Sequence, residues 1–394
     1  MKDIWRIAPV LSWSLLLPLG CGNGNGGETQ DGGTADCVVL PDHFDQNTTL
    51  PKACYLAHQT PVMASGVTLT LAPGVKIIFD QNIGLEFSTD TALVASGTAA
   101  DPILLTGAQA ENGFWEGLIF DTVQSSANRL DYVTVEYAGS TTAANDPDAA
   151  AVKAISDSGG VHLSMTHCNL RESQGWGLYL SGFAVVDEFA SNTITANTLG
   201  AASVGSEVAS VLDAASSYHG NTVDQVLVRT NLIGQAATWA SIDVPYVLDG
   251  ALNVDAVWTL SPGVNLVLDQ DAWIFVGDDA SAMNAVGTAA APITITGAQK
   301  TSGYWDTIQF DNTNNAANVF DHVVVEYGGS TANSGDFAEV AATSDSHGVT
   351  LTVRNSTFRH SPLCGLYLGT YATATIDSSN QYEDLAGGNV CQQP

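Results

Sequence analysis

The stretch GFWEGLIFD, residues 113–121, returns 190 positions later as GYWDTIQFD, residues 303–311. The similarity extends outward from this stretch, because 24 of 45 positions are identical between residues 97–141 and residues 287–331. GTAADPILLTGAQ aligns with GTAAAPITITGAQ, and LDYVTVEYAGST aligns with FDHVVVEYGGST. Self-similarity over such a length predicts a duplication within one repetitive fold.

Short runs of β-branched and aromatic residues recur within each copy, as in VKIIF (75–79) and YVTVEY (132–137). Gly, Asn, Asp, Ser and Pro separate these runs, which is typical of short strands joined by turns. A sandwich, a propeller or a solenoid can be built from such strands, but the period of about 40–50 residues expected of propeller blades is missing. We therefore expect an all-β parallel solenoid with a continuous apolar interior and with Gly and Asn at its corners. Residues 207–217 fit a helical turn or a strand and turn equally well.

The series LTLAPGVKIIF, VASGTAADPILLTG, GFWEGLIF, LDYVTVEYAG and GLYLSG resembles bacterial secreted right-handed parallel β-helix repeat proteins of the pectate-lyase-like superfamily. The resemblance covers about residues 45–385. It implies one continuous right-handed parallel β-helix of two homologous units, residues 37–245 with a cap and residues 246–394. The fold hosts lyases, hydrolases, epimerases and adhesins, so the resemblance implies no single activity.

The N-terminus predicts export. Basic residues precede an apolar run at residues 7–19, which is too short to span a membrane and suits a secretory signal. The run ends in LPLGC, which resembles the bacterial lipoprotein signal and implies removal of residues 1–20 and lipidation of Cys21. The Gly-rich residues 21–36 would form a flexible tether. An ordinary signal peptide followed by an unrelated Cys is the alternative. We expect a protein anchored by its lipid to the bacterial outer membrane or cell surface, with the membrane as a partner.

Five further cysteines fit an exported protein, because export permits disulfides. Their positions predict one disulfide, Cys37–Cys54, near the start of the folded body and a second, Cys364–Cys391, near its end. Each would contribute about 3 kcal/mol by constraining the unfolded chain. Cys168 is left over, and we expect it to be a small buried hydrophobic residue.

The charge balance excludes one class of partner. Lys and Arg number 11 and Asp and Glu number 41, which gives a formal net charge of −30. Such a surface repels phosphate backbones, so we expect no nucleic-acid partner. Because 45% of the residues are hydrophobic, the chain is globular rather than a disordered acidic segment.

Two repeated charged positions are the candidates for catalysis. Glu136 and Arg171 in the first unit have counterparts in Glu326 and Arg359 in the second. A carboxylate could serve in acid–base chemistry and an Arg could serve as a lyase base; a salt bridge or a hydrogen bond at a strand end is the structural alternative. The NTD, GHG and RIK motifs that the resemblance would imply for a polysaccharide hydrolase are missing from the sequence.

Each copy also places a Trp next to a carboxylate, at Trp115–Glu116 and at Trp305–Asp306. Such a pair could bind a sugar, with the ring stacked on the Trp and a hydroxyl bonded to the acid. Adjacent strand residues face opposite sides, however, so a packed Trp predicts a neighbouring carboxylate in solvent. We favour this second interpretation.

Two acidic loops supply oxygen ligands of the kind that Ca²⁺ binds. The candidate ligands are Asp146, Asp148, Asp269 and Asp271. Solvated turns are the alternative interpretation, and we expect no other cofactor.

Taken together, these features favour a non-catalytic cell-surface lipoprotein that acts as a scaffold, adhesin or glycan-binding module. Its partner would be a polysaccharide or a surface protein. Trp176, Tyr179 and Tyr367 are the aromatic residues that would stack on sugar rings. The alternative is a polysaccharide lyase or glycoside hydrolase of the pectate-lyase-like superfamily.

Overall fold

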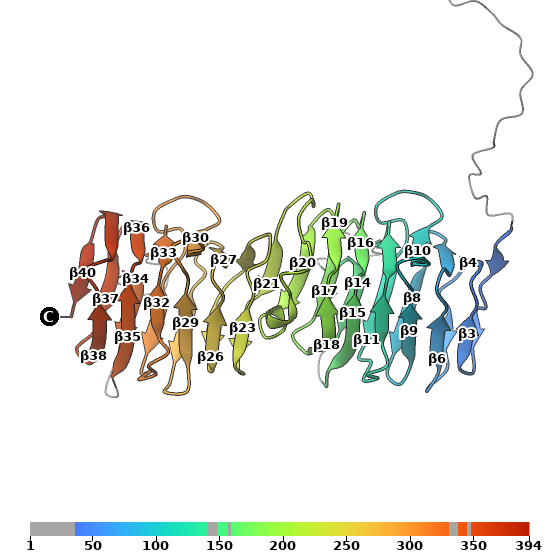
Figure 1. The fold of residues 1–394 in the computed structure, drawn as a ribbon, viewed down its shortest axis with the longest axis horizontal. Helices are drawn as coiled ribbons and strands as arrows, with labels where there is room; N and C mark the ends of the chain where they lie inside the picture. Colours follow the sequence, from blue (N-terminus) through green and yellow to red (C-terminus); the bar gives the residue numbers. More distant parts are fainter. Residues whose placement is uncertain (1–35, 141–147, 157–158, 331–337, 345–347, 394) are drawn as a thin grey trace, which may run out of the picture. The chain divides into compact units, whose positions relative to one another are not determined.

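The computed structural model describes residues 36–140, 148–156, 159–330, 338–344 and 348–393. The chain divides into residues 1–36 and a compact unit that begins at Cys37. Within this unit the named strands follow one another from β1 to β40 and pair in parallel (Figure 1). The predicted all-β parallel β-helix is therefore confirmed. Within the described ranges, no helix has the length and apolar character that a membrane span requires.

In the described ranges, five long sheets and one short pair build the unit. Sheet I contains β1 (Val38–Val39), β4 (Cys54–Ala57), β7 (Lys76–Phe79), β10 (Ile103–Gly107), β13 (Val133–Glu136), β16 (Asn169–Arg171) and β19 (Thr193–Thr195). Sheet II contains β8 (Gly84–Ser88), β11 (Gly117–Asp121), β14 (Ala150–Ile155), β17 (Trp176–Leu180), β20 (Gly200–Gly205), β21 (Val226–Arg229), β24 (Tyr246–Leu248), β27 (Asn265–Leu268), β30 (Ile293–Gly297), β33 (Val323–Glu326), β36 (Thr357–Ser361) and β39 (Gln381–Leu385).

Sheet III contains β3 (Thr48–Leu50), β6 (Thr68–Leu71), β9 (Ala92–Ser96), β12 (Arg129–Asp131), β15 (Val161–Thr166) and β18 (Ala184–Ala190). Sheet IV contains β22 (Leu232–Ile233), β25 (Leu252–Val254), β28 (Ile274–Gly277), β31 (Ile308–Asp311), β34 (Ala338–Thr343), β37 (Cys364–Leu368) and β40 (Gly388–Gln392). Sheet V contains β23 (Ala237–Trp239), β26 (Val257–Leu260), β29 (Ala282–Val286), β32 (Val319–Asp321), β35 (Val349–Arg354) and β38 (Ala372–Ile376), and the short pair is β2 (His43–Phe44) with β5 (Val62–Met63).

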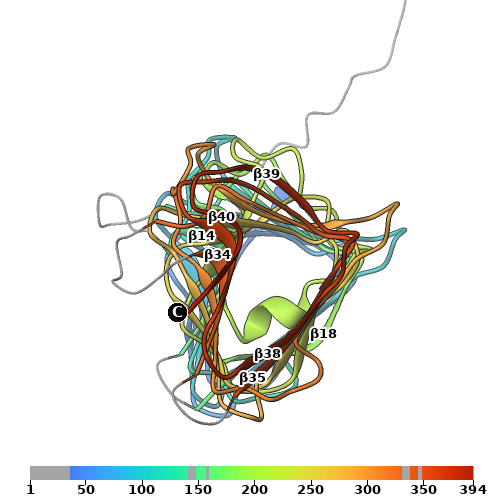
Figure 2. The same ribbon diagram turned by 90° about the vertical axis from the view of Figure 1, so that its left-hand side faces the viewer.

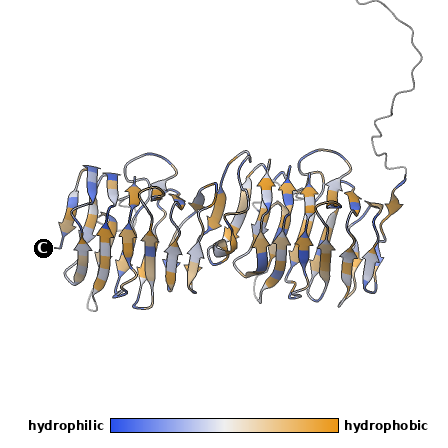
Figure 3. Cartoon of the chain, viewed as in Figure 1, coloured by the Kyte–Doolittle hydropathy of each residue, from blue (hydrophilic) through white to orange (hydrophobic). Residues whose placement is uncertain are grey.

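The core is a continuous column of inward-facing side chains. In β11, Leu118 and Phe120 are fully buried while Ile119 between them is not, as alternation along a strand requires. Aromatic rings stack between successive coils, with Phe79 and Trp115 4.1 Å apart at their centroids. Hydrophobic residues recur on the strands along the whole stack (Figure 3), so each coil buries its apolar face on the next.

The prediction of Gly and Asn at the corners is confirmed in part, because left-handed positions include Gly74, Gly263 and Asn312. Several left-handed positions carry larger residues, including Tyr132 (φ 50°), Tyr137 (φ 62°) and Tyr327 (φ 66°). This backbone costs about 1–2 kcal/mol for a residue with a Cβ. Hydrogen bonds to the next coil hold it in place, since the N–H of Tyr132 donates to Thr166 at 3.2 Å and that of Tyr327 to Arg359 at 3.2 Å. Stacking between coils therefore overrides the local preference.

Equivalent strands of the two units lie in different sheets. β10 belongs to sheet I and its counterpart β30 to sheet II, while β11 belongs to sheet II and its counterpart β31 to sheet IV. Viewed along the stack, β14 and β34 overlap on one side and β39 lies on another (Figure 2). Sheet II, which contains both β14 and β39, thus passes from one side of the β-helix to the next.

Sheet II changes sides between β20 and β21. These two strands pair directly, and the coil of chain between them contains no other named strand. In that coil a 3₁₀ turn, η2 (Val208–Val211), replaces a strand and settles the ambiguity of this segment. Figure 2 shows the light-green helical turn inside the ring of strands, where Val208 and Ala209 are buried. Sheets I and III end at β19 and β18, and sheets IV and V begin at β22 and β23. We call this break in the stack the junction.

Candidate functional site

Glu136, at the end of β13, lies between a Thr on the coil before it and an Arg on the coil after it. The Thr106 hydroxyl donates to Oε1 of Glu136 at 2.9 Å. Nε and Nη2 of Arg171 donate to Oε2 at 2.9 and 2.6 Å. The indole N–H of Trp115 donates to the backbone carbonyl of Glu136 at 2.8 Å. Glu136 is buried, and both of its carboxylate oxygens are occupied.

The second unit repeats this arrangement. Thr296 donates to Oε1 of Glu326 at 2.9 Å, and Nε and Nη2 of Arg359 each lie 2.7 Å from Oε2. The indole N–H of Trp305 donates to the carbonyl of Glu326 at 2.9 Å. We call these two sets of side chains the Thr–Glu–Arg columns. The sequence signal at Glu136 and Arg171 thus corresponds to two ion pairs with matching partners and distances.

The prediction for the two Trp–carboxylate dipeptides is confirmed for the Trp residues and wrong for one of the carboxylates. Trp115 and Trp305 are fully buried, as predicted. The prediction of a solvent-facing carboxylate is wrong for Asp306, which is also fully buried, and Glu116 is half-buried. Both dipeptides lie at a corner just before β11 and β31, where the alternation of a strand does not apply. Burial, and secondarily the nearby Glu86 carboxylate, raises the pKa of Glu116.

Glu339 on β34 is a buried carboxylate that sequence reasoning missed. Its Oε1 accepts the N–H of Gly328 at 3.3 Å, and its Oε2 has no hydrogen-bond partner in the described part of the chain. Burial raises the pKa of Glu339 well above its ordinary value of 4.5. The register places Ala151, also buried, at the equivalent position of the first unit. The sequence feature that could have indicated this buried carboxylate is a single Glu in the apolar run AEVAAT.

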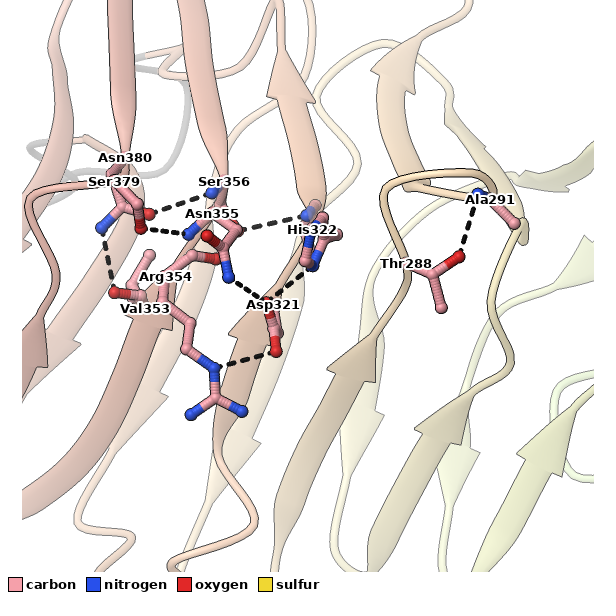
Figure 4. A network of polar contacts seen from close by, with 11 residues as sticks. Thr288, Ala291, Asp321, His322, Val353, Arg354, Asn355, Ser356, Ser379 and Asn380 are labelled. Carbon is pink, nitrogen blue, oxygen red and sulfur yellow. Dashed lines mark hydrogen bonds and ion pairs between the residues drawn. The ribbon is translucent and has the colours of Figure 1, made fainter.

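Asp321, at the end of β32, contacts polar groups from its own coil and from the next one (Figure 4). Nε of Arg354 donates to it at 2.8 Å and Nδ2 of Asn355 at 2.9 Å, and Nδ1 of His322 lies 2.8 Å away. Burial opposes ionisation of this carboxyl, but the hydrogen bonds from Asn355 and Arg354 outweigh it, so the pKa of Asp321 is lowered. His322, an isolated residue in the sequence, therefore belongs to a network that joins two coils.

The three aromatic candidates differ in exposure. Trp176 and Tyr179 on β17 are 5% and 8% exposed and pack together with Ala150. The guanidinium of Arg229 lies over the Tyr179 ring, 3.9 Å from its centroid. Tyr367 on β37 is half-buried. Sugar stacking by these residues stays a prediction, and for Trp176 and Tyr179 it would require the rings to become more exposed.

The calcium candidates come from two separate segments of the chain. Asp146 falls outside the described residues, and Asp148 lies just before β14. Oδ1 of Asp269 accepts from the Tyr304 hydroxyl at 3.0 Å, and Asp271 has a left-handed backbone (φ 57°). Among the described residues, no group of three or more His, Cys, Asp or Glu is placed to hold a metal ion. A structural Ca²⁺ stays a prediction.

Both predicted disulfides are confirmed. Cys37–Cys54 and Cys364–Cys391 have Cα–Cα distances of 4.6 and 6.1 Å. Disulfides of this kind persist outside the cytoplasm, which indicates a secreted or extracellular protein. Cys168 is free and buried, as expected, and burial raises the pKa of its thiol to about 12. Cys21 lies outside the described residues, so its lipidation stays a prediction.

Neither a protein-family model nor a curated protein matches the chain. Among solved structures, it is similar to a chain described as the Azotobacter vinelandii mannuronan C-5 epimerase AlgE6 A-module. The two share 11% identity with a TM-score of 0.23, over 89% of this chain and 91% of that one.

Proposed function

We propose that this protein is an exported, non-catalytic β-helix scaffold that binds glycans at the bacterial cell surface. The observation that carries this proposal is the pair of Thr–Glu–Arg columns. The repeated charged residues, which were the candidates for catalysis, are occupied in both units by the same partners at nearly the same distances.

A general acid or base must come within hydrogen-bond reach of its substrate, with a proton free to move. Glu136 and Glu326 are buried, and each is held by a Thr on one side and an Arg on the other. To act on a substrate, either carboxylate would have to break two or three hydrogen bonds and expose itself. The contacts instead join three successive coils, which is a stabilising role.

Two features support the proposed location. The two disulfides support export. The LPLGC stretch supports a lipid anchor on Cys21, which would hold the β-helix at the outer membrane or the cell surface. A stack of parallel coils offers an extended surface suited to a polymeric partner.

A panel of neutral and acidic polysaccharides tests the proposal. The purified protein is incubated with each, and bound polymer, new reducing ends and unsaturated products are measured in parallel. We expect binding to at least one glycan and no product above that of a heat-denatured control. Release of products by the folded protein would favour the alternative, a polysaccharide lyase or glycoside hydrolase.

A further inference from the structure

Two adjoining hollows open at the junction. The larger, of about 480 Å³, lies between η2 and the starts of β18 and β23. The smaller, of about 400 Å³, lies between Gly205 and the residues that follow β21. They share Gly182, Phe183 and Glu207. Their volumes fall within the range of about 300–1,000 Å³ that is usual for small-molecule sites. We call the two hollows together the junction site.

The hollows exist because the stack is interrupted there. η2 contacts β18, β20 and β23, and it turns Val208 and Ala209 into the core where a strand would otherwise continue the sheet. Two glycines allow close backbone packing beside it, since a Cβ on Gly205 would lie 2.5 Å from Cα of Gly182. A Cβ on Gly182 itself would meet nothing within 4 Å, so this residue faces open space.

The lining combines one exposed aromatic ring with polar side chains, most of them neutral. Phe183 is 53% exposed and borders both hollows. Around it lie the side chains of Glu207, Ser210, Thr230, Asn231 and Gln235. A flat apolar ring flanked by amides, hydroxyls and a carboxylate can bind a sugar, because the ring packs on the apolar face of the pyranose and the polar groups bond its hydroxyls.

Charge restricts the kind of sugar. Glu207 would repel a carboxylate or sulfate on the ligand, and Arg229 is the cation in the lining. Its guanidinium already lies over the Tyr179 ring, and its Nη1 donates to the Ser203 hydroxyl at 2.6 Å. Its Nη2 donates to the carbonyl of Leu180. An acidic sugar would have to take Arg229 away from these partners.

We propose that the junction site binds a short segment of a neutral oligosaccharide, with Phe183 as the stacking platform. This inference rests on the glycan-binding role proposed above and adds its location and ligand class.

The second unit supplies a matched control. Tyr371 lies just before β38, as Phe183 lies just before β18, and the pairing of these strands with β35 and β15 makes the two positions equivalent. Tyr371 is also 53% exposed. It is an aromatic residue of equal exposure on the same scaffold, away from the junction.

The test is calorimetric titration of the full chain with neutral gluco-, xylo- and manno-oligosaccharides and with oligogalacturonate as the acidic comparator. We expect a neutral ligand to bind, Phe183→Ala to weaken its binding by about tenfold, and Tyr371→Ala to leave it unchanged. Gly182→Trp should obstruct the border that the two hollows share and abolish binding, and Glu207→Gln should raise the affinity for the acidic ligand. Circular dichroism of each variant confirms its fold.

Three results would overturn the junction site: no neutral ligand bound, equal losses in Phe183→Ala and Tyr371→Ala, or full binding by a folded Gly182→Trp. If Gly182→Trp does not fold, the comparison of Phe183→Ala with Tyr371→Ala decides. Product release during the titrations would instead refute the non-catalytic proposal. If these variants leave glycan binding intact, the proposed glycan-binding role stands and only its location at the junction site is rejected.

Discussion

Replacing Arg171 by Met should loosen the first Thr–Glu–Arg column and leave the second unchanged. The side chain of Glu136 is 10% exposed and that of Arg171 is 43% exposed. Breaking a buried ion pair costs about 3–5 kcal/mol, whereas an exposed pair contributes about 0–1 kcal/mol. Because this pair is buried on one side only, we expect Arg171→Met to cost about 2 kcal/mol.

The loss should be local, since each coil of a solenoid contacts only its neighbours. Native-state hydrogen exchange is therefore the appropriate assay. A cost of about 2 kcal/mol corresponds to about thirtyfold faster exchange in β13 and β16. The equivalent strands β33 and β36 serve as an internal control and should not change, while Arg359→Met should give the reverse result.

A double variant separates the loss of the ion pair from the cost of leaving the Glu136 charge unpaired. Adding Glu136→Gln to Arg171→Met removes the unpaired charge, so exchange should return part of the way to the parent rate. Unchanged exchange in β13 and β16, or equal acceleration in both units, would refute the reasoning that the columns join neighbouring coils.

Three further predictions concern other groups. Glu339→Ala should raise the urea midpoint of unfolding more at about pH 8 than at about pH 4. Burial raises the pKa of Glu339 in the folded state, so the stability linked to its protonated form is complete below 4.5 and is lost as the pH rises through the folded-state pKa. Equal gains in the midpoint at both pH values would contradict this. Cys391→Ser should lower the free energy of unfolding by about 3 kcal/mol and speed hydrogen exchange in β37 and β40, while exchange in β1 and β4 stays unchanged. Protection retained in β40 would show that the disulfide does not stabilise this end of the β-helix. Metabolic labelling with a fatty acid should label the parent protein and not Cys21→Ser. An unlabelled parent protein would contradict the proposed lipid anchor.

The sequence predicted the fold because the duplication and the strand pattern are visible along the chain. YVTVEY was expected to be a strand, and Val133–Glu136 form β13. The two Tyr residues that flank it lie instead at left-handed corners. Local alternation identifies a strand, but the hydrogen bonds that hold a corner come from another coil.

The candidate site was predictable only in part, for the same reason. Glu136 and Arg171 were singled out by their repetition, yet their partnership spans 35 residues and depends on the coil register. Asp306 was expected in solvent because strand alternation was applied to a residue at a corner. The junction site has no sequence motif, since it arises where η2 replaces a strand and brings Phe183 beside Asn231.

The most direct test of the central claim compares the parent with the double variant Glu136→Gln/Glu326→Gln on the same polysaccharide panel, with products followed over time. If the columns are structural, neither protein should release products, and both should bind the same glycans while the variant is less stable. Product release by the parent that disappears in a folded variant would contradict the account and assign these carboxylates to catalysis.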